Sequence, residues 1–373
     1  MPLRSMVAMA SPVLLLVIVA LCALLGAGEA RERESVVGAS AFRSRATDPN
    51  MEVKFDFSPF LIQYKSGRVQ RFMGTTFTPP SLDPRTGVAS KDVVVDQATG
   101  LRARIYRPSR GAVIGGGGKR LPVLLYFHGG AFVVESAFDP VYHGYLNALT
   151  AKANVVAVSV NYRLAPEHPL PAAYDDAWAA LQWVVDNARR GGGGGGGGEP
   201  WLAKHGDVSR LFLAGDSAGG NIAHNLAMRA GQQQQHPSFL LAGRAAAPAI
   251  RGVALLDPYF LGRYVSPGAE RAWGFICAGK YGTGHPYVNP AAALPASAWR
   301  ALPPGRVLMT VSGNDRLGPF QRAYVDALRG SGWRGEARLY VTPGEGHCYF
   351  LNYLNSPKAA AHMATLAAFI NGS

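Results

Sequence analysis

The sequence predicts an α/β fold with a mostly parallel central sheet and helices on both of its faces. From Pro122 onward, short apolar runs rich in β-formers alternate with helical patterns. Strands that are apolar throughout and separated by helices are typical of a parallel sheet that is buried on both faces. Two earlier β-prone runs, Lys91–Asp96 and Leu101–Arg107, flank the turn signal Ala98-Thr99-Gly100. They predict a hairpin that adds antiparallel strands at one edge.

The expected elements follow in chain order. Strands are expected at Pro122–Phe127, Val155–Val160, Leu211–Ala214, Gly252–Leu256, Arg306–Val311 and Ala337–Val341. Helices are expected at Tyr142–Ala153, Tyr174–Arg189, Ser217–Ala230, Phe320–Arg329 and Lys358–Ile370. The tracts Gly191–Gly198 and Gln232–Gln235 are of low complexity, so we expect them to form surface loops.

Residues 51–373 are expected to form one α/β domain with an N-terminal lid segment and a helical cap, which suits a chain of 373 residues. The lid is assigned to Met51–Phe77, where aromatic residues alternate with polar ones. The cap is assigned to Tyr259–Pro295, where the alternation of strands and helices lapses.

Residues 1–30 have the composition of a secretory signal peptide, and the polar residues 31–50 that of a flexible leader. Arg4 provides a positive start, Val13–Leu25 is continuously apolar, and Gly28 and Ala30 are small residues suited to cleavage. A stretch this short falls below the ~20 residues that span a bilayer. We therefore expect cleavage, a secretory or extracellular location and no stable membrane span, with an uncleaved signal anchor as the alternative.

The basic excess does not indicate a nucleic-acid partner. Lys and Arg number 37 against 24 for Asp and Glu, but the basic residues are scattered and form no patch interleaved with aromatics. Three cysteines are too few for a disulfide framework. With Cys22 in the signal, Cys277 and Cys348 remain, either as a pair or, as we prefer, as two free thiols. No metal or cofactor motif is present, so none is expected.

The segment Leu211–Gly220 carries the most specific signal. A buried strand runs into Gly215-Asp-Ser-Ala-Gly219 and then into a helix. A Gly-x-Ser-x-Gly turn between a strand and a helix is the setting of an exposed, strained nucleophilic serine. Ser217 is therefore the expected nucleophile.

A serine nucleophile needs a base and an acid that orients the base. In folds with this turn, the acid and then the histidine follow the serine, on loops after later strands. Asp315 follows the run Arg306–Val311, and His347 follows Ala337–Val341. We expect Asp315 and His347 to complete the site, with Glu345 as the rival acid.

Donors for an oxyanion are expected on the loop His128–Phe132, which directly follows the strand Pro122–Phe127. Its His-Gly-Gly sequence matches the oxyanion loop of lipases and esterases. The backbone N–H groups of this loop and of Ala218 can converge on one oxygen. His128 precedes the glycines, and we expect it to brace the loop rather than act as the base.

These motifs resemble the hormone-sensitive-lipase-like esterases, and their plant carboxylesterase branch in particular. The resemblance rests on His128–Phe132, Asn161–Asp176, Gly215–His224, Tyr281–Pro290 and Gly344–Phe350. It implies an α/β-hydrolase fold with a helical cap. It also implies an oxyanion hole at Gly129, Gly130, Ala131 and Ala218, in which Gly129 lets the loop turn and the other three donate.

The expected function is a serine carboxylesterase that acts on small or medium esters through an acyl-enzyme on Ser217. Two alternatives share the scaffold. One is a gibberellin-receptor-like binding protein, which lacks the histidine that is present here as His347. The other is a dehydratase, and related dehydratases tend to carry Thr where this chain has Ser217.

Overall fold

The computed structural model describes residues 51–109, 120–190, 198–235, 250–262, 265–300, 302–303 and 305–372. The expected signal peptide, the leader, Cys22 and nearly all of the glycine tract lie outside these residues. In the described part, no helix has the length and apolar character needed to cross a membrane.

A nine-stranded sheet forms the centre of the molecule, in the order β12-β11-β10-β9-β7-β8-β6-β5-β4. Within the group β7 to β12, every pair of neighbouring strands is parallel. Their bounds are β7 Leu121–Phe127, β8 Val156–Asn161, β9 Gly206–Asp216, β10 Ile250–Leu256, β11 Arg306–Ser312 and β12 Glu336–Thr342. The predicted α/β class and the mostly parallel sheet are confirmed.

The predicted hairpin is also confirmed, at the edge of this sheet. Strands β5 (Val88–Asp96) and β6 (Leu101–Pro108) pair antiparallel, and β6 pairs antiparallel with β8. The short strand β4 (Leu82–Asp83) pairs with β5 at the outer edge.

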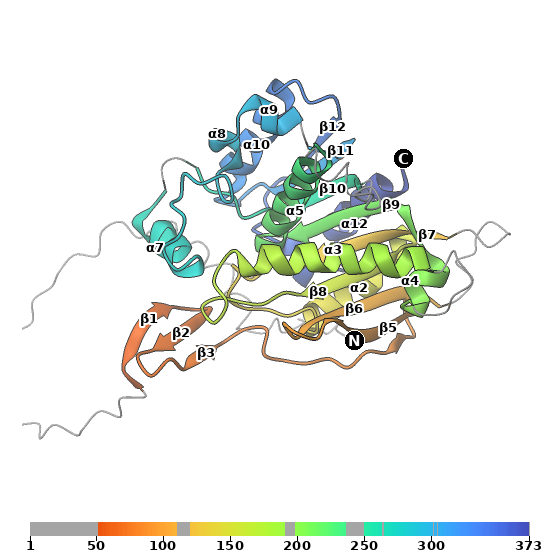
Figure 1. Ribbon diagram of the computed structural model, residues 1–373, viewed down its shortest axis with the longest axis horizontal. Coiled ribbons are helices and arrows are strands. Elements are labelled where there is room, and N and C mark those ends of the chain that lie inside the picture. The colour runs from red at the N-terminus through yellow and green to blue at the C-terminus, as the bar shows by residue number, and fades with distance from the viewer. Residues whose placement is uncertain are drawn as a thin grey trace, which may run out of the picture.

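Helices cover both faces of the sheet (Figure 1). One face carries α3 (Ala172–Arg190), α5 (Ala218–Gln235) and α10 (Gly318–Gly330), and the other carries α2 (Pro140–Ala153), α11 (Tyr349–Asn352) and α12 (Pro357–Asn371). The shorter helices are α4 (Pro200–His205), α7 (Pro267–Ile276), α8 (Pro290–Ala293) and α9 (Ala296–Arg300).

Each central strand contributes side chains to two separate apolar cores, one on each face of the sheet. In β7, Val123, Leu125 and Phe127 pack under α3 and α5, whereas Leu124 and Tyr126 pack under α2 and α12. Successive side chains of a strand point to opposite faces, so a strand buried on both sides must be apolar at every position. This is why these strands appear in the sequence as unbroken apolar runs.

The prediction that Gln232–Gln235 forms a surface loop is wrong. Helix α5 continues through Gln232–Gln235 instead of ending at Ala230. Glutamine is a good helix former, so a short polar run directly after a helix extends it more readily than it ends it. The low complexity of the run carried no information about its backbone.

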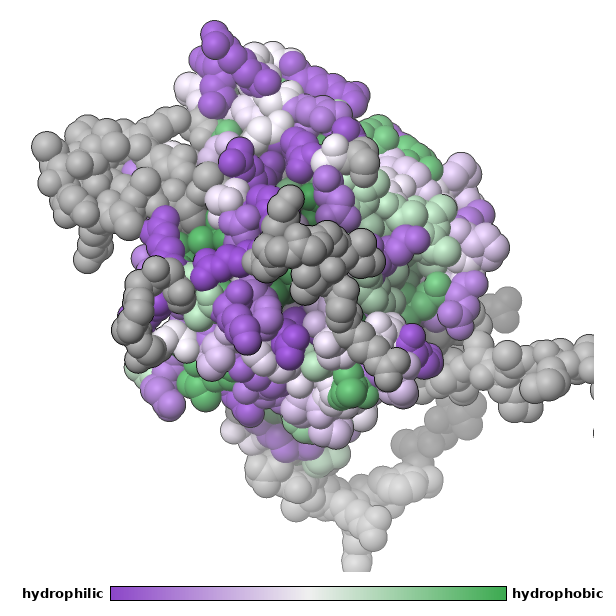
Figure 2. Space-filling model, turned by 90° about the vertical axis from the view of Figure 1, so that its right-hand side faces the viewer, coloured by the Kyte–Doolittle hydropathy of each residue, from purple (hydrophilic) through white to green (hydrophobic). Residues whose placement is uncertain are grey.

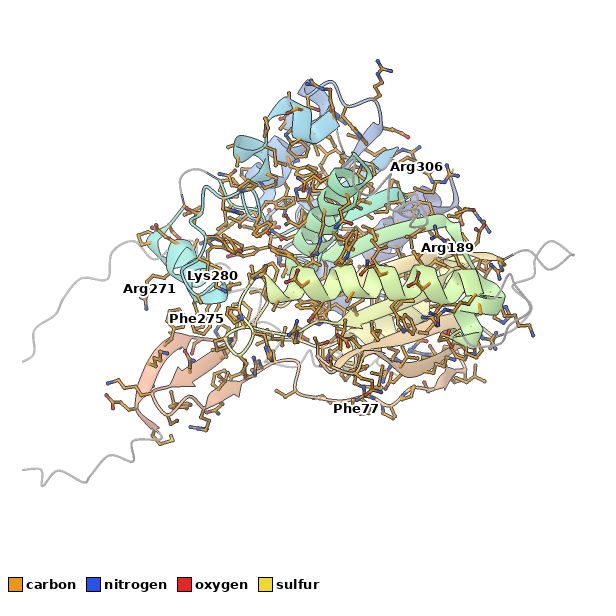
Figure 3. All side chains as sticks on the ribbon, in the orientation of Figure 1. Phe77, Arg189, Arg271, Phe275, Lys280 and Arg306 are labelled. Carbon is orange, nitrogen blue, oxygen red and sulfur yellow. The ribbon has the colours of Figure 1, made fainter. Side chains whose placement is uncertain are left out.

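The expected lid segment forms a small antiparallel sheet of β1 (Val53–Phe57), β2 (Leu61–Tyr64) and β3 (Val69–Arg71). This sheet lies beside α7, in the stretch assigned to the cap (Figure 1). Phe55 of β1 stacks on Phe275 of α7 with ring centroids 4.1 Å apart, and Figure 3 shows Phe275 on the side of α7 that faces this sheet. Stacking of this kind ties the two segments together.

The surface hydropathy and the state of the cysteines both agree with what the sequence indicated. Hydrophilic residues are spread over the face seen in Figure 2, with hydrophobic residues in smaller groups. Cys277 and Cys348 are both buried and free, as preferred from the sequence.

The turn after β9 packs directly against the end of β7. A β-carbon added to Gly219 would lie 2.0 Å from the carbonyl oxygen of Phe127, and one added to Gly215 would lie 2.3 Å from the carbonyl carbon of Gly219. These contacts are between backbone atoms, which cannot rotate away. Only glycine fits at either position.

We therefore expect Gly219→Ala to lower the free energy of unfolding by at least about 1–3 kcal/mol, because the backbones must separate. Gly274→Ala is the matched control. Nothing lies within 4 Å of a β-carbon at Gly274, which is inside α7, so its change to alanine should stabilise the protein by about 0.5–1 kcal/mol. Urea unfolding of the variants measures both effects. Equal midpoints for the Gly219→Ala variant and the wild type would contradict the packing argument.

Candidate active site

Ser217 occupies a sharp, left-handed turn between β9 and α5. Its φ angle is 51°, which is costly for a residue with a side chain. Backbone hydrogen bonds hold it there: its N–H donates to Leu256 (2.9 Å), and its carbonyl accepts from Tyr259 (2.8 Å). The strained turn expected of a nucleophilic serine is therefore present at Ser217.

His347 and Asp315 meet across the loops that follow β12 and β11. The Nδ1 atom of His347 lies 2.7 Å from Oδ2 of Asp315. Asp315 also accepts hydrogen bonds from the Leu317 N–H (2.9 Å) and the Gln321 amide (3.0 Å). The carboxylate is thus fixed on several sides, and Nδ1 of the histidine is committed to it.

The other histidine nitrogen remains unused. Nε2 of His347 is buried and has no hydrogen-bond partner among the described residues. A proton on Nδ1, donated to Asp315, leaves a lone pair on Nε2. This is the tautomer that a general base requires.

The charge around His347 favours its protonated form. Burial alone lowers the pKa of His347, but the negative charges of Asp315, Asp257 and Asp216 outweigh it and raise the pKa above the ordinary 6.5. Burial raises the pKa of Asp315, and the charge and hydrogen bond of His347 outweigh it and hold the carboxyl below its ordinary value. The pair is therefore a strong base held by an ionised acid.

Glu345, the rival acid, and His128, the rival base, make no hydrogen bond to the His347–Asp315 pair in the described part of the chain and have other partners. Glu345 forms an ion pair with Lys358 at 2.7 Å. His128 is fully buried, stacks on Tyr162 with centroids 4.3 Å apart, and lies 2.9 Å from the carbonyl of Gly129 through Nδ1. Burial lowers the pKa of His128 to about 4. It braces the loop and stays neutral.

The His128–Phe132 loop has three consecutive residues with positive φ: Gly130 (93°), Ala131 (52°) and Phe132 (63°). Among the described residues, the N–H groups of Gly130 and Ala131 have no acceptor. Ala218, the first residue of α5, has no acceptor for its N–H within the helix. By contrast, Gly129 donates to the Tyr142 hydroxyl at 2.8 Å. Gly129 therefore shapes the loop, and it is not a free donor.

Two buried acids that the sequence analysis did not identify support this arrangement. Asp216 accepts hydrogen bonds from the hydroxyls of Tyr126 (2.8 Å) and Tyr142 (2.9 Å). Because Tyr142 also binds Gly129, it links the serine turn to the glycine loop. Asp257 accepts from Ser312 N–H and Cys348 N–H, each at 2.8 Å. It thereby joins the loops of Asp315 and His347.

Ser217 and His347 line one cavity of about 600 Å³ together with Gly130 and Ala131. Part of the wall comes from the N-terminal segment, through Phe60, Phe72, Met73, Gly74, Thr75 and Thr76. This supports the expectation that the segment covers the site. A volume of this size accommodates a small to medium organic molecule.

One group of side chains among the described residues has the spacing of metal ligands: ligand atoms of Asp257, His347 and Cys348 lie within 4.8 Å of one another. Two of the three already make hydrogen bonds within the protein, since the Asp257 carboxylate accepts from the Ser312 and Cys348 N–H groups, and Nδ1 of His347 binds Asp315. That no cofactor or metal takes part remains a prediction.

A family model described as an alpha/beta hydrolase fold matches residues 124–351, which include Ser217, Asp315, His347 and the His128–Phe132 loop. The chain belongs to the α/β-hydrolase family. Probable carboxylesterase 7 of Arabidopsis thaliana is 40% identical over 86% of this chain and 98% of its own length. Tuliposide A-converting enzyme 1 of Tulipa gesneriana is 44% identical over 86% of this chain and 79% of its own. The predicted plant carboxylesterase branch is therefore confirmed.

Solved structures agree with this placement. The esterase LipW of Mycobacterium marinum is 26% identical, with a TM-score of 0.58, and the match covers 77% of this chain and 82% of that one.

A further sequence relative, from Glycyrrhiza echinata, is named 2-hydroxyisoflavanone dehydratase and is 38% identical over 88% of this chain and 99% of its own. The chain is an esterase-type α/β-hydrolase of the carboxylic ester hydrolase class.

The prediction of a secretory or extracellular location, with a signal anchor as the alternative, is wrong. Relatives from Tulipa gesneriana are named chloroplastic or amyloplastic, which are plastid locations and contradict the predicted secretory one. The apolar stretch Val13–Leu25 does not distinguish the two destinations, because hydropathy shows only that a segment is apolar and does not identify the targeting receptor that recognises it.

The hydrogen bond between Asp315 and His347 gives a prediction on pH. We expect kcat/KM of the wild type to fall on the acid side with a single-proton slope and a midpoint above 6.5, because the base must be neutral and its pKa is raised. Asp315→Asn removes a negative charge, so the midpoint should move to lower pH. It should also cut kcat by orders of magnitude, since the wrong ring nitrogen then carries the proton.

Glu345→Gln is the matched control, because Glu345 binds Lys358 and not His347. It should change neither the midpoint nor kcat by more than a few-fold. Initial rates measured from pH 5 to 9 decide the matter. A larger loss in the Glu345 variant than in the Asp315 variant would make the acid assignment wrong.

Proposed function

We propose that the protein is a serine carboxylesterase that hydrolyses small or medium carboxylic esters through an acyl-enzyme on Ser217. The observation that carries the proposal is the Nδ1–Oδ2 hydrogen bond of 2.7 Å between His347 and Asp315, at a cavity that also contains Ser217. This hydrogen bond leaves the second ring nitrogen of His347, Nε2, buried and without a hydrogen-bond partner among the described residues.

In the first half of the reaction, Nε2 of His347 takes the proton of the Ser217 hydroxyl as Oγ attacks the ester carbonyl carbon. The carbonyl oxygen becomes an oxyanion, which accepts hydrogen bonds from the N–H groups of Gly130, Ala131 and Ala218. Losing one such donor typically costs about 2.7–4 kcal/mol of transition-state stabilisation. The alcohol then leaves with the proton from His347, and Ser217 keeps the acyl group.

In the second half, water replaces the alcohol. His347 takes one proton from the water as its oxygen attacks the acyl carbon, and the oxyanion again accepts from the same donors. Collapse releases the carboxylic acid and returns the proton to Ser217. Asp315 stays ionised throughout and stabilises the imidazolium, in agreement with its lowered pKa.

The two alternative functions receive less support. A binding protein on this scaffold has no use for a histidine held at 2.7 Å by a buried acid. A dehydratase is kept as an alternative because the relative from Glycyrrhiza echinata carries that name. The strained turn at Ser217 favours nucleophilic attack, which elimination of water does not require.

We expect Ser217→Ala and His347→Ala each to remove nearly all hydrolysis of p-nitrophenyl acetate, and the double variant to be little worse than either. The two residues act in one step, so their losses do not add. Steady-state rates for the three variants measure this. Losses that multiply would show that the two residues act independently, which contradicts the proposed mechanism.

A further inference from the structure

One carboxyl group in the cavity takes no part in this mechanism. Glu135 lines the same cavity as Ser217 and His347 and is only partly exposed. Two other acids share the wall, Asp139 and Asp216. Asp139 accepts the N–H of Val141 at the start of α2, and Asp216 accepts two tyrosine hydroxyls. Among the described residues, no hydrogen bond or ion pair is made by the Glu135 side chain.

Close packing fixes the position of Glu135. A β-carbon on Gly130 would lie 2.8 Å from Cγ of Glu135, so the side chain runs beside a proposed oxyanion donor. A β-carbon on Gly74, in the N-terminal segment, would lie 2.1 Å from Cα of Glu135. The residue has a φ of 72°, a strained conformation that the fold retains. Glu135 is therefore held between the N-terminal segment and the reacting centre.

The surroundings of Glu135 favour its neutral form. Burial, with the charges of Asp139 and Asp216, raises the pKa of Glu135 to about 8. Tyr142 and Tyr162 also face it, and both remain uncharged because burial raises their pKa values further. Arg71, which donates to the Val133 carbonyl two residues before Glu135, forms its ion pair with Glu167 instead.

We propose that Glu135 determines substrate specificity: its carboxyl group hydrogen-bonds a hydroxyl group of the ester, so that the site prefers hydroxylated esters to plain alkyl esters. This inference rests on the proposed function. A carboxylic acid both donates and accepts, which matches a hydroxyl. Among the described residues that line the cavity, none is a lysine or arginine that would select a carboxylate or phosphate instead.

The neutral form also suits the reaction. An ionised carboxylate beside Gly130 would repel the developing oxyanion, whereas a protonated one does not. A site built to bind a substrate hydroxyl also rejects the analogue that lacks it, because its own polar group is then left unpaired.

The test compares two matched pairs of esters by titration of the released acid at pH 7. One pair has the hydroxyls in the alcohol, 2,3-dihydroxypropyl butyrate against propyl butyrate. The other has it in the acyl group, ethyl 3-hydroxybutyrate against ethyl butyrate. We expect the wild type to favour the hydroxylated ester of at least one pair by about tenfold in kcat/KM. Glu135→Gln should keep most of this preference, and Glu135→Leu should abolish it.

Glu270→Gln is the control, since Glu270 is exposed on α7 and lies outside the cavity. It should leave rates and preference unchanged. A wild type without preference in either pair, or a Leu variant that retains it, would overturn the inference. So would a preference for choline butyrate over its uncharged 3,3-dimethylbutyl analogue that Glu135→Gln removes, because Glu135 would then bind a cation.

A pH profile keeps the inference falsifiable if the Leu variant does not fold. Glu135 is protonated below its pKa of about 8 and ionises above it, whereas His347 becomes neutral as the pH rises through its own raised pKa. Wild-type kcat/KM should therefore pass through a maximum and fall on the alkaline side of it. Glu135→Gln cannot ionise and should remove this fall, while a fall that persists in it would count against the inference. Hydrolysis that requires Ser217 but shows no hydroxyl preference overturns this inference alone. Hydrolysis that does not require Ser217 overturns the proposed function.

Discussion

The site depends on one backbone contact, where Gly219 of the serine turn lies against the carbonyl of Phe127 at the end of β7. Because β7 and β9 are neighbours in the sheet, this contact sets the distance between the serine and the loop that follows β7. Ser217, two residues before Gly219 in the same turn, has a strained φ of 51° and is held by backbone hydrogen bonds to Leu256 and Tyr259. Any side chain at Gly219 would force the two backbones apart and move the proposed nucleophile relative to the proposed oxyanion donors.

Buried acids add a second layer of support. Through Tyr142, Asp216 connects the serine turn to Gly129, and Asp257 connects the loop of Asp315 to that of His347. Burying a carboxyl group is costly unless it is hydrogen-bonded. Here the hydrogen bonds fix the loops that carry the candidate catalytic residues, so the cost of burial is offset by a rigid site.

The sequence singles out candidate residues where the signal is local. Ser217 can be proposed as nucleophile because glycines on both sides of it, between a strand and a helix, have few other uses. Asp315 and His347 can be proposed from their order and their positions after strands, and the structure places the two in contact. Asp257 and Glu135 could not be found this way, because their importance comes from contacts with residues distant in the chain. In the sequence alone, Asp257 is an ordinary acidic residue after a predicted strand, and Glu135 is an ordinary acidic residue in a predicted loop, so nothing distinguishes either from other acids.

The central claim is that Ser217 becomes covalently acylated. The most direct measurement is peptide mass mapping after treatment with an active-site-directed organophosphonate, which mimics the tetrahedral intermediate. We predict one equivalent of added mass on the peptide that contains Ser217, lost activity in proportion to labelling, and no label in the Ser217→Ala variant. Labelling of a different residue together with loss of activity, or hydrolysis that continues in fully labelled protein, would contradict the account.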